Sequence, residues 1–216
     1  MGTTTRIAAA LLGALLAAPA ARAQDYSGAV GYGGGGIWFG DFNEQGPSLA
    51  LQSGWLAAVH AEQYLGRGRI GARLGAAFTQ RPFDAAGLAR DINTWLFDGS
   101  LLLRPLPVDR RRSVVPFLSV GAGVVSYGFG EGRPVVFEES GAVYPGDTDR
   151  RLTVVGGLGV DFVPRFSLWG TPLGVRLEAA DHVALESPFQ TPDGDPLGPV
   201  HNVRVTLGLI GLVELP

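Results

Sequence analysis

The chain has 216 residues, of which 46% are hydrophobic and only 17% are charged, and its formal net charge is −3. Average globular chains carry about 25% charged residues, so this composition leaves little polar material to cover a water-facing surface. The slight acidity excludes the concentrated basic face of a nucleic-acid-binding protein. The absence of cysteine excludes a disulfide framework.

The N-terminus has the three-part layout of a secretory signal peptide. Arg6 supplies a positive charge, residues 7–21 are apolar and mostly small, and an A-x-A cleavage pattern ends at Ala23. The apolar stretch is shorter than the roughly 20 residues of a membrane-spanning helix, which makes a retained anchor the less favoured alternative. The sequence therefore predicts a cleavable signal helix over 1–23 and an exported domain over 24–216.

Beyond the signal, apolar and polar residues alternate with a period of two, as in strands with two different faces. No later stretch is apolar for the roughly 18 residues that would indicate a transmembrane helix. The alternating runs exceed the mode of about 5–6 residues for soluble strands and reach the about 9–11 of tilted membrane strands. Eight strands are predicted, at 28–40, 48–64, 70–83, 92–104, 114–128, 151–163, 173–184 and 200–214.

The links between these strands alternate in character. Outer-membrane barrels have short periplasmic turns and longer external loops, so the alternation predicts both termini on the periplasmic side. The tighter links are 66–69, 105–113 and 164–172, and the predicted external loops are 41–47, 84–91, 129–150 and 185–199.

The two faces of each strand differ in chemistry. Near the C-terminus, Val203, Val205 and Leu207 alternate with Arg204 and Thr206. A soluble barrel would turn such a polar face to water, whereas a membrane barrel turns the apolar face to lipid and the polar face inward. Small residues and balanced charges favour a narrow, filled lumen, because removing one partner of a buried ion pair costs about 3–5 kcal/mol. The predicted lumen charges are Glu62, Arg73, Asp98, Arg104, Asp161, Arg176, Glu178 and Arg204.

Aromatic residues give a further expectation. Membrane barrels carry aromatic girdles at both interfaces. The aromatic residues near predicted strand ends or turns are Trp55, Phe78, Phe83, Trp95, Phe117 and Trp169.

Three segments carry a family resemblance, in addition to the signal peptide and the eight-strand rhythm: 116–123 (PFLSVGAG), 176–178 (RLE) and 201–209 (HNVRVTLGL). With them, the whole of 24–216 resembles the small OmpA/OmpX-like barrels of Gram-negative outer membranes. The resemblance implies an all-β, eight-stranded antiparallel up-and-down transmembrane barrel in the bacterial outer membrane. It also implies a monomer that contacts outer-membrane lipid and lipopolysaccharide and is inserted by the barrel-assembly machinery. Family members usually end on an aromatic residue, whereas this chain ends on Pro216.

No catalytic motif accompanies these patterns. Lipid A deacylases of similar architecture place a Ser two residues after a His, and His60, His182 and His201 all lack that Ser. The sequence therefore predicts a non-enzymatic barrel with a structural or surface-interaction role, a lumen closed by an Arg–carboxylate network, and no cofactor or metal site. Two alternatives stay open: an OmpW-like carrier or narrow channel for small hydrophobic molecules, and a soluble periplasmic lipocalin-like binding barrel.

Overall fold

The computed structural model describes residues 26–39, 54–65, 68–85, 88–108, 113–128, 135–136, 143–144, 148–163, 167–187 and 198–213. The predicted signal peptide, the chain end over 214–216 and most of the predicted external loops lie outside these residues. Across the described ranges the regular structure consists of β-strands. No helix among them is long and apolar enough to cross a membrane.

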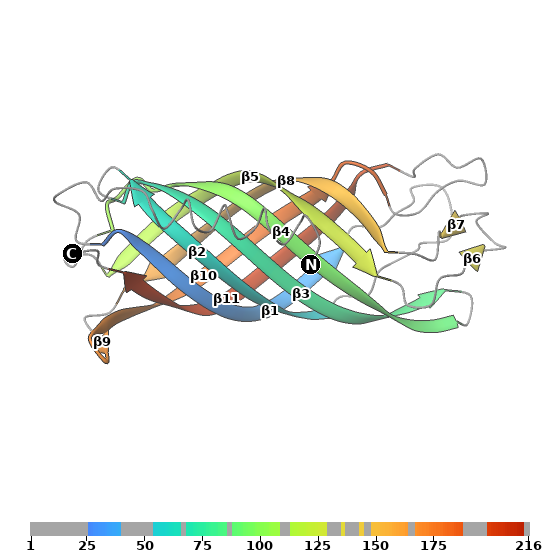
Figure 1. Ribbon diagram of the computed structural model, residues 1–216, viewed down its shortest axis with the longest axis horizontal. Coiled ribbons are helices and arrows are strands. Elements are labelled where there is room, and N and C mark those ends of the chain that lie inside the picture. Colours follow the sequence, from blue (N-terminus) through green and yellow to red (C-terminus); the bar gives the residue numbers. More distant parts are fainter. Residues whose placement is uncertain are drawn as a thin grey trace, which may run out of the picture.

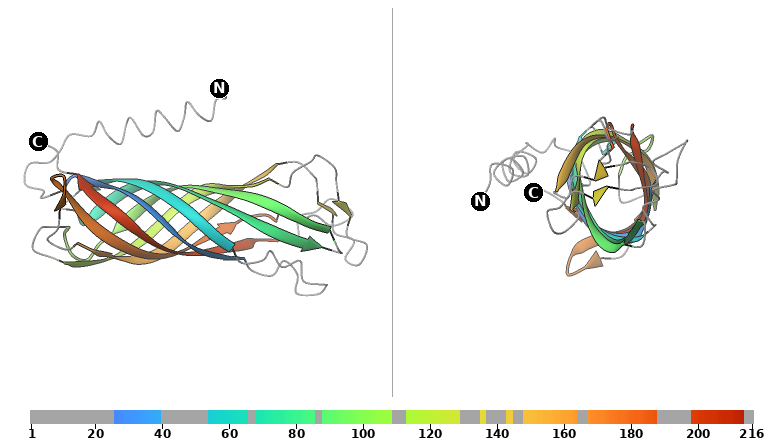
Figure 2. Two further views of the ribbon diagram at one scale, coloured as in Figure 1. Left: turned by 90° about the horizontal axis from the view of Figure 1, so that it is seen from below. Right: turned by 90° about the vertical axis from the view of Figure 1, so that its right-hand side faces the viewer.

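Eight long antiparallel strands close into a barrel (Figure 1; end-on in Figure 2). Consecutive long strands are neighbours in the wall, and pairing of the first with the last closes it, which is the up-and-down topology. This confirms the predicted fold class. The strands are β1 (Gly28–Phe39), β2 (Gly54–Leu65), β3 (Ile70–Ala85), β4 (Leu88–Leu103), β5 (Val114–Gly128), β8 (Asp149–Phe162), β10 (Thr171–Ala184) and β11 (Val200–Val213).

Three predicted links contain more structure than the sequence indicated. The prediction of an external loop at 84–91 is wrong, because β3 and β4 stay paired up to Ala85 and Leu88. A two-stranded ladder satisfies backbone hydrogen bonds without an apolar face, so pairing continues beyond the point where the alternation stops. Three two-residue strands, too short to show a period, were also missed: β6 (Val135–Val136), β7 (Val143–Tyr144) and β9 (Ser167–Leu168).

The register of the strands sets their tilt. Following paired residues once around the wall from Gly28 leads back to β1 at Trp38, ten residues further along the strand. In an eight-stranded barrel a stagger of this kind goes with a strand tilt of about 35–45°. The 12 residues of β1 extend about 40 Å along the strand at about 3.3 Å per residue. With this tilt they span roughly 30 Å along the barrel axis, which is enough to cross a hydrocarbon core.

The outward face of the barrel is apolar. Leu152, Leu207 and Leu158 are 67%, 61% and 60% exposed, and the outward positions of the other long strands are similarly occupied by Val, Leu and aromatic residues. A water-facing wall built this way would expose a large apolar surface, whereas a lipid-facing wall needs one. This arrangement overturns the soluble lipocalin-like alternative, in which the apolar face would point inward.

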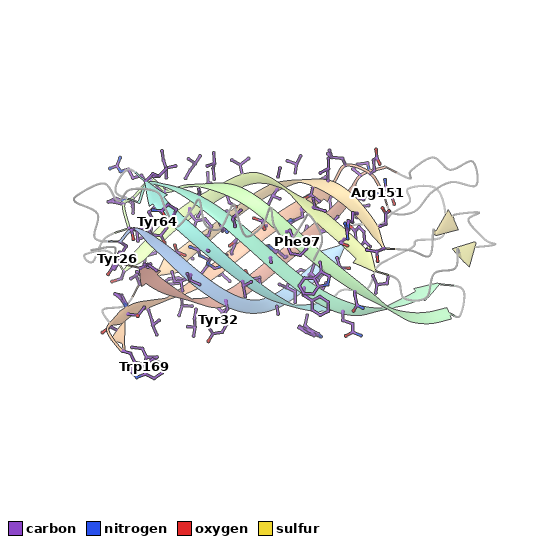
Figure 3. The ribbon with its side chains drawn as sticks, viewed as in Figure 1. Tyr26, Tyr32, Tyr64, Phe97, Arg151 and Trp169 are labelled. Carbon is purple, nitrogen blue, oxygen red and sulfur yellow. The ribbon has the colours of Figure 1, made fainter. Side chains whose placement is uncertain are left out.

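The exposed tryptophans lie at two levels of the barrel. Trp38 and Trp55 face outward next to the ends of β1 and β2 that are predicted to be external. Trp95 faces outward in the middle of the longer β4, and the centre of its ring lies 4.6 Å from that of Phe78. At the periplasmic end, Trp169 projects from the β9–β10 turn and is 95% exposed, at the opposite end of the barrel from Arg151 (Figure 3).

The girdle prediction was wrong for Phe117, which is buried inside the lumen. The alternation of β5 places Leu118 and Val120 outward and therefore Phe117 inward. The side chain of Phe83 lies outside the described part of the chain.

Candidate functional site

The barrel interior is the candidate functional site, because the eight predicted lumen charges all point into it. Their relative exposures lie between 1% for Asp161 and 7% for Glu62. They come from β2, β3, β4, β8, β10 and β11, and from Arg104 directly after β4. Closure of the barrel gathers them into two groups of two acids and two arginines, so that each group is formally neutral.

The first group, here called the periplasmic quartet, consists of Glu62, Arg104, Asp161 and Arg176. Arg176 donates from Nε to Asp161 Oδ1 over 2.6 Å and from Nη2 to Asp161 Oδ2 over 2.9 Å. It also donates to both carboxylate oxygens of Glu62, from Nη2 over 3.2 Å and from Nη1. Arg104 Nη2 lies 2.9 Å from Glu62 Oε2 and 3.7 Å from Asp161 Oδ2. Each acid therefore contacts both arginines.

Aromatic rings support the two arginines of this quartet. The guanidinium carbon of Arg176 lies 4.6 Å from the centre of the Phe117 ring. That of Arg104 lies 4.6 Å from the Tyr64 ring and 5.7 Å from Phe117. Cation–π contacts of this kind stabilise a desolvated guanidinium by up to about 2 kcal/mol. The inward Phe117 is thus part of the charged layer.

The second group, the external quartet, consists of Arg73, Asp98, Glu178 and Arg204. Glu178 accepts two hydrogen bonds, one at Oε2 from Arg73 Nη1 over 2.8 Å and one at Oε1 from Arg204 Nη2 over 3.3 Å. Asp98 is less tightly held, 3.9 Å from Arg73 Nη2 and 3.8 Å from Arg204 Nη2. Its Oδ1 also accepts a 2.7 Å hydrogen bond from Ser100.

Two histidines join these quartets. His60 Nε2 lies 3.1 Å from Arg176 Nη1, and His182 Nε2 lies 4.0 Å from Asp98 Oδ2. Neither histidine is among the eight predicted lumen charges. For His182, the available signal was its spacing of four residues from Glu178, which puts both side chains on one face of β10.

Apolar layers lie on both sides of the charged layer. At the periplasmic end, the buried cluster contains Tyr26, Ala29, Tyr64, Val108, Val115, Val163, Ile210 and Leu212. Toward the external end, Ile37, Leu56, Leu96 and Val125 are at most 1% exposed. In that region the Tyr127 hydroxyl donates to Asn202 Oδ1 over 3.0 Å, which joins β5 to β11 across the interior.

The cavity that the described residues form in the charged layer is small. A cavity of about 20 Å³ lies beside Gly33, Gly75 and Gly208, with His60 and Arg73 among its lining residues. This volume accommodates about one water molecule. Among the side chains that the structure describes, no group of three or more His, Cys, Asp or Glu residues could hold a metal ion.

A pair of glycines on β8 tests how tightly the lumen is packed. A Cβ on Gly159 would lie 2.5 Å from the Phe117 ring and 2.7 Å from the carbonyl oxygen of Leu177. Gly159→Ala is therefore expected to lower the free energy of unfolding by about 1–3 kcal/mol, the usual cost of overpacking. Urea titration of the barrel in micelles, followed by its gel mobility, measures this change.

Gly156→Ala is the matched control on the same strand. A Cβ on Gly156 meets no atom within 4 Å, so this variant is expected to retain wild-type stability. Equal stability of the two variants would contradict a filled lumen.

The comparisons with known proteins match this architecture. No protein-family model and no curated protein matches the chain. Among solved structures, the chain is similar to Neisserial surface protein A, with 10% identity, a TM-score of 0.54, and coverage of 85% of this chain and 96% of that one. It is also similar to Ail, the attachment invasion locus protein of Yersinia pestis, solved with the heparin analogue sucrose octasulfate. There the identity is 15%, the TM-score 0.51, and the coverage 88% of this chain and 99% of that one.

These likenesses cover nearly the whole described barrel and establish its fold. The apolar outer wall and the charge-filled interior are the physical features that a membrane-spanning barrel of this size requires. The chain is therefore an eight-stranded antiparallel β-barrel that is similar in fold to Neisserial surface protein A and Ail, with an outer wall suited to a membrane.

Proposed function

We propose that this chain is a non-enzymatic outer-membrane barrel with a structural or surface-interaction role and a lumen that conducts neither ions nor small solutes. The observation that carries the proposal is the pair of neutral quartets that cross the interior. A permeating ion would have to separate buried ion pairs, and breaking one such pair costs about 3–5 kcal/mol.

The carrier alternative finds less support. A small hydrophobic molecule needs a continuous apolar path, and the charged layer separates the periplasmic apolar cluster from the external apolar residues. The roughly 20 Å³ cavity is far below the about 300–1,000 Å³ of typical ligand pockets.

The histidines also favour a non-enzymatic role. His60 and His182 contact charged lumen residues. His201 faces outward, and its Nδ1 contacts the carboxylate of Asp181 and not a hydroxyl. Nucleophilic catalysis needs such a hydroxyl within reach of its base.

A surface role is supported by the part of the barrel beyond the membrane. β3 and β4 have 16 residues each, four more than β1 and β2. Their hairpin extends past the rest of the wall at the end opposite the C-terminus (Figure 1). We propose that this hairpin and the neighbouring external loops present the contact surface of a monomer that the barrel-assembly machinery inserts.

Planar-bilayer recording tests the closed lumen. Purified barrel, shown to be folded by its mobility shift on boiling, is expected to give no stable single-channel conductance at moderate voltage and salt. A reproducible conductance that scales with salt concentration would overturn the proposal.

A further inference from the structure

Few of the outer-wall side chains that the structure describes are charged, and their positions are informative. Along the outward faces of the eight long strands, the acidic and basic side chains that the structure describes are Arg150, Asp181 and His201. Arg150 is the second residue of β8, at its external end, whereas Asp181 lies three residues inside the external end of β10. A carboxylate on a lipid-facing wall is costly unless it is paired, and such residues mark functional sites.

Asp181 and His201 form a defined pair. The carboxylate Oδ2 lies 2.6 Å from His201 Nδ1, and Oδ1 accepts a 3.1 Å hydrogen bond from the backbone N–H of Asn202. The carboxylate therefore accepts a hydrogen bond from Nδ1–H and fixes the orientation of the imidazole ring. The side chain of His201 is 56% exposed. The imidazole, which carries Nε2 as its other ring nitrogen, therefore faces away from the barrel.

The pair lies close to one of the external aromatic residues. Asp181 is paired with Val203, which is itself paired with the exposed Trp38 on the other side. Aromatic residues of membrane barrels lie at the boundary between acyl chains and headgroups. His201 is two residues nearer the external end of β11 than Val203, so its imidazole lies diagonally beside Trp38 and among the headgroups of the outer leaflet.

We propose that His201, held by Asp181, forms a binding site for the phosphate of an outer-leaflet lipid headgroup. With both ring nitrogens protonated, Nε2 donates to a phosphate oxygen while Nδ1 donates to Asp181. Trp38 provides an aromatic surface beside the same headgroup. Charge-assisted hydrogen bonds to phosphate are among the stronger polar contacts in proteins, and this one would anchor a lipid to one side of the barrel.

Native mass spectrometry of the folded barrel in micelles tests the site, with phosphatidic acid as the phosphate-bearing probe and phosphatidylcholine as its counterpart. We expect selective adducts with phosphatidic acid. His201→Gln is expected to weaken its apparent affinity about tenfold, as loss of one charged hydrogen bond implies. Asp181→Asn, which keeps the ring but loses its charged partner, is expected to weaken it about threefold.

Arg150→Gln is the matched control, since it removes an outward charge elsewhere on the external rim. The affinity of this variant for phosphatidic acid is expected to stay within about twofold of wild type. Boiled and unboiled gel mobility verifies that each variant is folded. Wild-type affinity in His201→Gln, or an equal loss in Arg150→Gln, would overturn the proposal. Displacement of the lipid by millimolar inorganic phosphate would identify a site for a soluble anion and would also overturn it.

Discussion

Arg176→Met is expected to lower the free energy of unfolding by about 3–5 kcal/mol, the cost of leaving buried charges without their partner. The substitution removes the hydrogen bonds to Asp161 and Glu62 and the contact with the Phe117 ring. Arg104 alone then remains beside two buried carboxylates. Methionine retains most of the side-chain volume, so the loss of stability comes mainly from the missing positive charge.

Urea titration of the barrel in lipid vesicles, read by the fraction that keeps its folded gel mobility, measures this change. Arg151→Met is the control at the external rim, where the ion pairs with Asp149 and Glu186 are partly exposed. Partly exposed pairs of this kind contribute at most about 1 kcal/mol. Similar losses in the two variants would mean that the lumen is hydrated enough to screen its charges.

Leu158→Arg is the second large effect, with an expected cost of about 2–4 kcal/mol, because it places a cation on the lipid-facing wall. Leu158 is 60% exposed and lies between Val154 and Phe162 on the outward face of β8. In a soluble barrel, an equally exposed position would accept arginine almost without cost.

Leu185→Arg provides the comparison for this second variant. Leu185 is 56% exposed and follows the last residue of β10 at the external end, where a charge near the interface costs about 0–1 kcal/mol. Urea unfolding of both variants in the same vesicles measures the difference between their free energies of unfolding. Equal stability of the two would contradict a membrane-spanning wall.

The strands and their faces were predictable because they depend on local sequence. Alternation along β11 assigns Val203 and Arg204 to opposite faces without knowledge of any neighbour. The same rule places Phe117 inward. The prediction that it belongs to an aromatic girdle was wrong because it used only the closeness of Phe117 to a strand end and not its place in the alternation. Lengths were less predictable, since the β3–β4 ladder continues where the alternation has stopped.

The geometry of the lumen was not predictable from the chain alone. The sequence indicated four acids and four arginines on the polar face, but it contained no information on which would meet. Glu62 and Arg176 are 114 residues apart in the chain, and their contact depends on closure of β1 against β11 and on the ten-residue stagger of the wall. The same holds for Asp181 and His201, which neighbouring strands bring together from 20 residues apart.

The sequence by itself determined that this protein forms long two-faced strands with an apolar side and a charge-balanced side, since both properties are local and periodic. Only the tertiary structure decided that the charges divide into two neutral quartets and that one acid–histidine pair faces outward. The physical reason is that a two-residue period specifies the side of the wall, whereas the height and partner of each side chain depend on strand register and tilt.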